Sequence, residues 1–191
     1  MIMNGIKRLK KRKDDEMVIE MKLRFYGDPV LRQKSEKIIE FNDELHNIIE
    51  EMATIMYKED GAGLAGPQVG LNKQIFIEDD SSGTGWKAFI NPEITYFSEE
   101  MDVAEEGCLS IPDIFENVER SKTIRLTYQT VDGAIHKEEI SGYLARIIQH
   151  ETDHLNGVLF IDHISMIKRR LLKKRLDAIK EKAKEVYKHA G

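Results

Sequence analysis

Two histidines and a glutamate stand at the spacing of a metal-binding helix in the segment His150-Glu151-Thr152-Asp153-His154. Positions i and i+4 of a helix lie on the same face, so the two imidazoles can bind one ion. Glu151, about 100° around the helix from His150, would lie beside that ion and could move protons. The same spacing also arises by chance on a solvated helix. Residues 144–148 are largely apolar, however, and buried histidines require polar partners.

A catalytic metal site needs a third protein ligand and an open position for water. The longer metallopeptidase pattern H-E-x-x-H-x-x-G-x-x-H fits as far as Gly157 but ends in Phe160, which cannot bind a metal. No glutamate follows until Glu181, and His163 lies beyond the expected helix end. The single cysteine, Cys108, is the better candidate, because a metal deprotonates a thiol and binds the thiolate strongly. Without the histidines, Cys108 would be interpreted as a small core residue.

Three helices are expected to position these groups. Asp43 can cap the first, whose apolar residues recur at helical spacing from Leu45 to Ile55. Ser141 can cap the second, which carries the histidines and ends at Asn156-Gly157. The third covers about residues 164–188, and its predicted apolar stripe consists of Ile164, Ile167, Leu171, Ile179, Ala183 and Val186.

Strand-like segments occupy the middle of the chain. They are residues 74–77, residues 87–90 (ended by Asn91-Pro92), residues 123–130 and a return strand that ends near Ile140. Strands and helices are segregated, which predicts an α+β fold with mixed or antiparallel β-sheets around a central metal-binding helix, and a long C-terminal helix. We expect Cys108 to lie on the central sheet.

The composition indicates one globular domain. The 191 residues are 41% hydrophobic and 33% charged, and the net charge of −5 gives no general attraction to DNA. No apolar run is long enough to span a membrane. Residues 1–20 are charged and aperiodic, so we expect a disordered tail before a single catalytic domain at residues 21–191, with Met17 or Met21 as alternative starts. Acidic residues 14–16 stand where a secretory signal would be apolar, which favours the cytoplasm.

Three ordered motifs together resemble the peptide deformylase family. They are residues 61–68 (GAGLAGPQ), residues 106–110 (EGCLS) and residues 149–155 (QHETDHL). The similarity extends from about Leu23 to the terminal helix, with one departure: Gly66 stands where the family usually has alanine. That substitution could loosen the loop that places Gln68, but it removes no functional group.

The resemblance implies hydrolysis of the N-formyl group from N-formylmethionyl nascent polypeptides, with release of formate. It implies one divalent metal held by Cys108, His150 and His154. Two imidazoles and a thiolate suit zinc, nickel, cobalt or iron, and ferrous iron is expected from the resemblance alone. The metal would supply hydroxide as the nucleophile, Glu151 would be the general acid and base, and the Gln68 amide and the Leu109 N–H would stabilise the negative charge on the formyl oxygen.

The glycine-rich motif fits peptide binding, because Gly61 and Gly63 allow a substrate backbone to approach closely. We expect the substrate to contact Ala62 and Gly107 as well. A pocket for the methionine side chain is expected near Leu64, Tyr143 and Ile147, although each of these three could be an ordinary core residue. Glu106 and Arg120 are candidates for an ion pair that braces the Cys108 strand.

Six cations, at Lys168-Arg169-Arg170 and Lys173-Lys174-Arg175, lie on the expected terminal helix. Such a helix could contact ribosomal RNA through phosphates, and a solvated helix face is the alternative.

Two other functions fit parts of the sequence. A zinc peptidase would share the histidine helix but needs a third ligand other than Cys108. A non-catalytic metal-binding or RNA-binding module would rest on the basic residues at the two ends, 7–13 and 168–175, and would leave Glu151 and Gln68 without a role.

Overall fold

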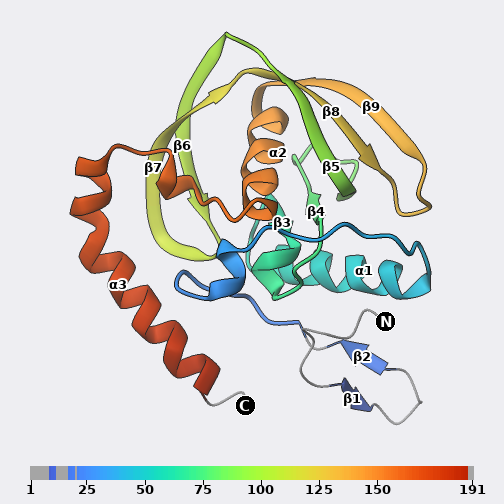
Figure 1. Cartoon of the computed structure of the whole chain (residues 1–191), viewed down its shortest axis with the longest axis horizontal. Coiled ribbons are helices and arrows are strands. Elements are labelled where there is room, and N and C mark those ends of the chain that lie inside the picture. The colour runs from blue at the N-terminus through green and yellow to red at the C-terminus, as the bar shows by residue number, and fades with distance from the viewer. Residues whose placement is uncertain (1–8, 12–16, 20, 189–191) are drawn as a thin grey trace.

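The computed structural model describes residues 9–11, 17–19 and 21–188, with side chains described from residue 21 to residue 185. Its largest element is an antiparallel five-stranded sheet with the strand order β3-β4-β5-β8-β9 (Figure 1). The strands are β3 (Gly63–Ala65), β4 (Ile75–Glu78), β5 (Lys87–Phe97), β8 (Thr123–Gln129) and β9 (Ile135–Ser141). A separate antiparallel pair consists of β6 (Met101–Cys108) and β7 (Ile111–Ser121).

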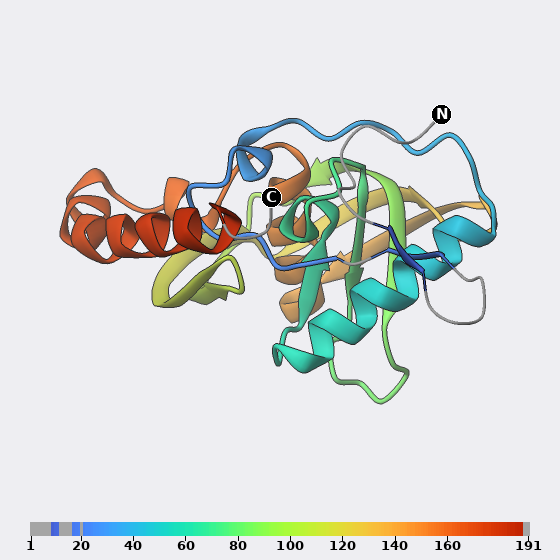
Figure 2. The same ribbon diagram turned by 90° about the horizontal axis from the view of Figure 1, so that it is seen from below.

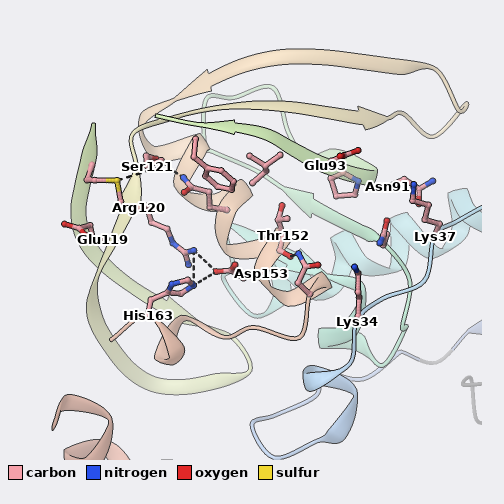
Figure 3. A pocket seen from close by; sticks show the side chains of 17 residues that line it. Lys34, Lys37, Asn91, Glu93, Glu119, Arg120, Ser121, Thr152, Asp153 and His163 are labelled. Carbon is pink, nitrogen blue, oxygen red and sulfur yellow. Dashed lines mark hydrogen bonds and ion pairs between the residues drawn. The ribbon is translucent and has the colours of Figure 1, made fainter. Parts of the chain in front are cut away.

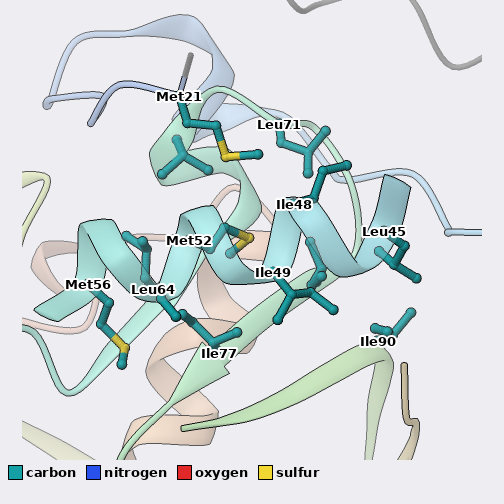
Figure 4. Close-up of a cluster of buried hydrophobic side chains, with 13 residues drawn as sticks. Met21, Leu45, Ile48, Ile49, Met52, Met56, Leu64, Leu71, Ile77 and Ile90 are labelled. Carbon is teal, nitrogen blue, oxygen red and sulfur yellow. The ribbon is translucent and has the colours of Figure 1, made fainter. Parts of the chain in front are cut away.

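Helix α2 (Gly142–Leu155) lies at the centre and contacts strands of both sheets (Figure 1). Helix α1 (Asp43–Lys58) packs near the opposite face of the large sheet. Strand β4 shows how the sheet separates the two helices. Ile75 and Ile77 belong to the α1 cluster, in which Figure 4 labels Ile77. Phe76 packs instead with the residues around α2. Successive strand residues point to opposite faces, so an apolar strand can supply both cores.

Helix α3 (Met166–Lys188) forms one end of the molecule and packs on β7 (Figure 2). Three short 3₁₀ helices connect the larger elements: η1 (Pro29–Arg32), η2 (Gly66–Val69) and η3 (Phe160–Asp162). Strands β1 (Leu9–Lys11) and β2 (Met17–Ile19) pair with each other. The rest of the predicted tail, residues 1–8, 12–16 and 20, lies outside the described residues.

The predicted α+β class is confirmed, and several local predictions are wrong. Strand β5 does not stop at Asn91-Pro92 but continues to Phe97 through irregular pairing with β8. Asn91 has a φ of 49°, and its side-chain amide bonds the backbone N–H and carbonyl of Ile38, which accommodates the irregularity. Helix α1 is capped by the side chain of Asn42 instead of Asp43.

Two further predictions, on the sheet that carries Cys108 and on the buried face of α3, need correction. Cys108 lies on the β6–β7 pair and not on the large sheet. The predicted stripe of α3 is partly right: Ala183 is buried, and Ile164 and Ile179 pack against the core. Ile167 and Leu171 are exposed, however, and the buried residues Leu172 and Leu176 were not predicted. The side chain of Val186, also predicted in that stripe, lies outside the described part of the chain.

Candidate metal centre

His150 and His154 lie one turn apart on α2, and both are buried. Their ring centroids are 5.0 Å apart. The helix ends directly after them, where Asn156 is the C-cap and Gly157 adopts a φ of 72°, which favours glycine. The side chain of Ser141 makes no capping bond and instead bonds Thr123.

Cys108, at the end of β6, brings its sulfur to the two imidazoles. Its Sγ lies 3.3 Å from Nε2 of His154. One donor atom from each of Cys108, His150 and His154 can be chosen so that all three lie within 4.8 Å of one another. Burial alone would raise the pKa of the Cys108 thiol, but the charges and hydrogen bonds of the two imidazoles outweigh it and lower the pKa to about 5. The three residues therefore form a donor set of one thiolate and two imidazoles, which fits a divalent metal.

Glu106 fixes the orientation of His150. Its Oε2 lies 3.0 Å from Nδ1 of His150, which leaves Nε2 of that ring free to face the sulfur. Glu106 also accepts hydrogen bonds from Arg120 and Arg146, so the predicted Glu106–Arg120 ion pair is present. Burial favours the neutral carboxyl, but the hydrogen bonds from His150 and Arg120 and the charge of Arg120 hold the pKa of Glu106 well below its usual range.

Glu151 is almost fully buried beside the ligand set, and its Oε2 has no hydrogen-bond partner. It packs over Gly63, where an added Cβ would lie 2.5 Å from Oε1 of Glu151. Burial raises the pKa of this carboxyl to about 7, against the opposing charges of His150 and His154. A carboxyl that titrates near neutral pH can both accept and deliver a proton.

Gln68 presents its amide N–H groups to the same site. Its Oε1 accepts a hydrogen bond of 2.8 Å from the Ala65 N–H, which directs Nε2 toward Cys108. Nε2 lies 3.5 Å from Sγ of Cys108 and 3.3 Å from Oγ of Ser110. Gly66 is buried in the same loop, and a Cβ there would lie 2.8 Å from the Leu71 carbonyl oxygen, so the glycine permits close packing.

A cavity of about 550 Å³ opens onto this site. The predicted residues that line it are Gly61, Ala62, Gly63, Gln68, Gly107, Cys108, Leu109, Tyr143, Ile147, His150 and Glu151. Leu64 does not line it, because this side chain points to the opposite face of β3 and is fully buried in the α1 core.

The cavity also has lining residues that sequence reasoning missed, among them Leu23, Phe25 and Phe115. The backbone of residues 24 and 26 is hydrogen-bonded to the site: the Arg24 N–H donates to the Gln68 carbonyl, and the Tyr26 N–H donates to the Ser110 carbonyl. No motif marked Leu23, Phe25 or Phe115, and their apolar types alone resemble core.

A half-buried thiolate and two buried imidazoles lie beside a carboxyl and a side-chain amide and next to a cavity. This arrangement defines the site of a mononuclear metallohydrolase. The sequence model described as polypeptide deformylase matches residues 21–170. Peptide deformylase of Thermotoga sp. (strain RQ2) is 52% identical over 155 residues, which cover 81% of this chain and 93% of the relative.

Solved structures agree. The crystal structure of peptide deformylase from Thermotoga maritima is 50% identical with a TM-score of 0.73 and covers 76% of this chain and 97% of its own. That from Plasmodium falciparum is 35% identical with a TM-score of 0.82 and covers 86% of this chain and 98% of its own. The chain belongs to the polypeptide deformylase family. It is an enzyme that removes the N-formyl group from nascent peptides. Among the described residues, no helix is long and apolar enough to cross a membrane.

Proposed function

We propose that the chain performs this hydrolysis with one divalent ion held by Cys108, His150 and His154 and with Glu151 as the proton carrier. The observation that carries the proposal is the convergence of the three donor atoms beside a buried, unpaired Glu151 oxygen. When bound, the ion lowers the pKa of water and polarises the formyl carbonyl.

The remaining steps fall to side chains and main chain of this protein. Glu151 takes the proton of the attacking water and passes it to the departing methionyl amine, for which a pKa near 7 is suited. The Gln68 Nε2 and the Leu109 N–H donate hydrogen bonds to the formyl oxygen as its negative charge grows. Loss of one such donor typically costs about 10²–10³ in rate.

We assign the substrate backbone to Gly61, Ala62 and Gly63, because these residues line the cavity and lead into β3, an edge strand of the large sheet. Gly107 lines the same cavity. We assign the methionine side chain to the region of Ile147 and Tyr143, which also line the cavity.

The test compares formate release from a formyl-methionyl peptide with release of acetate from its acetylated twin. Glu151→Gln should keep the metal and lose turnover by at least about 10²-fold, whereas Cys108→Ala should lose the metal. Glu99→Gln, an exposed residue outside both sheets, is the control for removal of a carboxylate. Full turnover by Glu151→Gln would refute its assigned role.

We propose ferrous iron as the native metal, with zinc, nickel and cobalt as ions that the same donors accept. Protein purified without oxygen should contain about one iron per chain and lose activity in air as iron or Cys108 is oxidised. Equal amounts of zinc and undiminished activity in air would exclude iron.

We also propose that α3 contacts ribosomal RNA, and that the enzyme acts in the cytoplasm where nascent chains are made. Several of its cations already have partners: Lys168 pairs with Glu116, Arg169 with Asp162, and Lys173 with Asp177. Arg170 and Lys174 have no partner among the described residues, and they neighbour the exposed Leu171.

Substitution is a sharper test of this contact than truncation, because truncation would uncover the core beneath α3. Arg170→Glu with Lys174→Glu should weaken sedimentation with ribosomes and leave turnover of a free formyl peptide unchanged. Unaltered ribosome affinity would remove this surface from the proposal.

A further inference from the structure

A second cavity, of about 710 Å³, lies on the other side of α2 and contains none of the three proposed metal ligands. The side chains of Arg120, Asp153 and His163 meet at one of its walls (Figure 3). Asp153 belongs to α2 and directly precedes His154, while His163 is the C-cap of η3. The sequence offered His163 as a possible metal ligand. In the structure it contacts Asp153 and Arg120 and is not one of the three clustered donors.

A chain of hydrogen bonds runs from this wall to the metal centre. Nε2 of His163 lies 2.7 Å from Oδ2 of Asp153, and Nη1 of Arg120 donates to the same oxygen at 2.5 Å. Nε and Nη2 of Arg120 donate to the two oxygens of Glu106, each at 3.0 Å. Glu106 in turn holds Nδ1 of His150.

Burial increases along this chain from the cavity toward the metal centre. The side chain of His163 is 35% exposed and that of Asp153 21%, whereas Arg120 and Glu106 are each 5% exposed. The outer members therefore can be altered with little loss of core packing, while the inner ones cannot. Arg120 uses three donors in one plane, so Asp153 fixes the direction of the two that hold Glu106.

We propose that His163 is a positioning residue for the metal centre: by holding Asp153, it keeps Arg120 and Glu106 in the geometry that directs the His150 ring toward the metal. Partners of this kind outside the ligand set commonly alter metal affinity by about 10–100-fold when they are removed. The inference rests on the proposed function, because it requires Cys108, His150 and His154 to bind the ion.

The alternative is that His163 only fastens η3 to the end of α2. That role predicts a change in thermal stability and none at the metal. The deciding measurement is therefore made at the metal, on the full chain loaded with Co²⁺. It records the thiolate-to-cobalt absorption band and the Co²⁺ affinity by competition with a chelator.

His163→Leu should lower the Co²⁺ affinity about 10-fold and shift the absorption band. His163→Gln, which keeps an N–H donor, should recover part of that loss. Asp153→Asn should reduce affinity as well, and His163→Leu should add little in that background, because both act through one chain of contacts. Lys34→Leu is the control, since Lys34 lines the same cavity and has no partner among the described residues.

Turnover supplies a second readout: kcat should fall in His163→Leu while KM stays near that of the parent. Unchanged affinity and spectrum in His163→Leu would overturn the inference, whatever the melting temperature does. If His163→Leu does not fold, the affinities and spectra of His163→Gln and Asp153→Asn decide the question in the same way. Absence of a thiolate–cobalt band in the parent protein would refute the proposed ligand set, and this inference with it.

Discussion

At the scale of single residues, the position of the Glu151 carboxyl depends on Gly63 in strand β3. Gly63 has no side chain, and the Glu151 carboxyl fills the space where a Cβ would be. The sequence identified both residues, because the i, i+4 histidines define the helix face and the glycines mark a close approach. For Leu64 the core alternative is confirmed and the pocket is not: Leu64 follows Gly63 on the strand, and successive strand residues point to opposite faces.

Gly63→Ala should therefore disable the enzyme without touching a ligand. The added methyl would meet Glu151 Oε1 at 2.5 Å and its Cδ at 2.9 Å, so the carboxyl must move from its position beside the site. We expect kcat/KM to fall by about 10²-fold or more, as for other displaced catalytic groups, with one metal per chain retained. Metal analysis and steady-state kinetics on the same sample check this. Wild-type kinetics in Gly63→Ala would show that Glu151 acts from a different position.

At the scale of elements, the sequence located the helices better than their buried faces. Helix α3 was expected at about residues 164–188 and is found at Met166–Lys188. Its sequence has apolar residues on two overlapping stripes, and the one that begins at Leu172 packs against Ile111, Ile114 and Val118 of β7. The helical period alone does not show which stripe is buried. That depends on contact with β7, a strand that the sequence did not predict.

Two leucines on α3 give a matched test of that face. Leu176 is 3% exposed and Leu171 is 77% exposed. Leu176→Ala should lower the free energy of unfolding by about 2–4 kcal/mol, through lost burial and a cavity. Leu171→Ala should change it by less than about 0.5 kcal/mol. Urea unfolding measures both, and equal effects would mean that α3 does not pack as described.

At the scale of the whole molecule, the segregation of strands and helices predicted the fold class, and the motifs predicted the Cys108, His150 and His154 cluster. The walls of the substrate cavity were predicted only in part. Those walls come from four separated stretches: residues 23–25, 59–68, 105–115 and 143–151. The motifs indicated the reacting groups and the glycine-rich part of the lining, such as Gly61, Gly63 and Gly107. They did not indicate Leu23, Phe25 or Phe115, which reach the cavity through tertiary packing.

The free energy of unfolding of the domain should depend on pH through one buried acid outside the site, Glu78. Glu78, at the end of β4, is 5% exposed, and its Oε2 has no hydrogen-bond partner. Burial raises its pKa to about 7, with further increases from the charges of Asp80 and Asp79 and a partial offset by Lys87. Between about pH 4.5 and 7 the folded protein then binds more protons at this position than the unfolded chain, so its contribution to stability falls as pH rises.

Glu78→Gln removes this titration and keeps the shape of the side chain. Its free energy of unfolding should exceed that of the parent by about 2 kcal/mol at pH 8, and the difference should shrink toward pH 5, since at that pH the parent carboxyl is already neutral. Urea unfolding at pH 5, 6, 7 and 8 measures the difference, with Glu99→Gln as an exposed control. Parallel curves for Glu78→Gln and the parent would show that the Glu78 carboxyl is charged in the folded protein throughout this range, and hence that polar groups or water satisfy it.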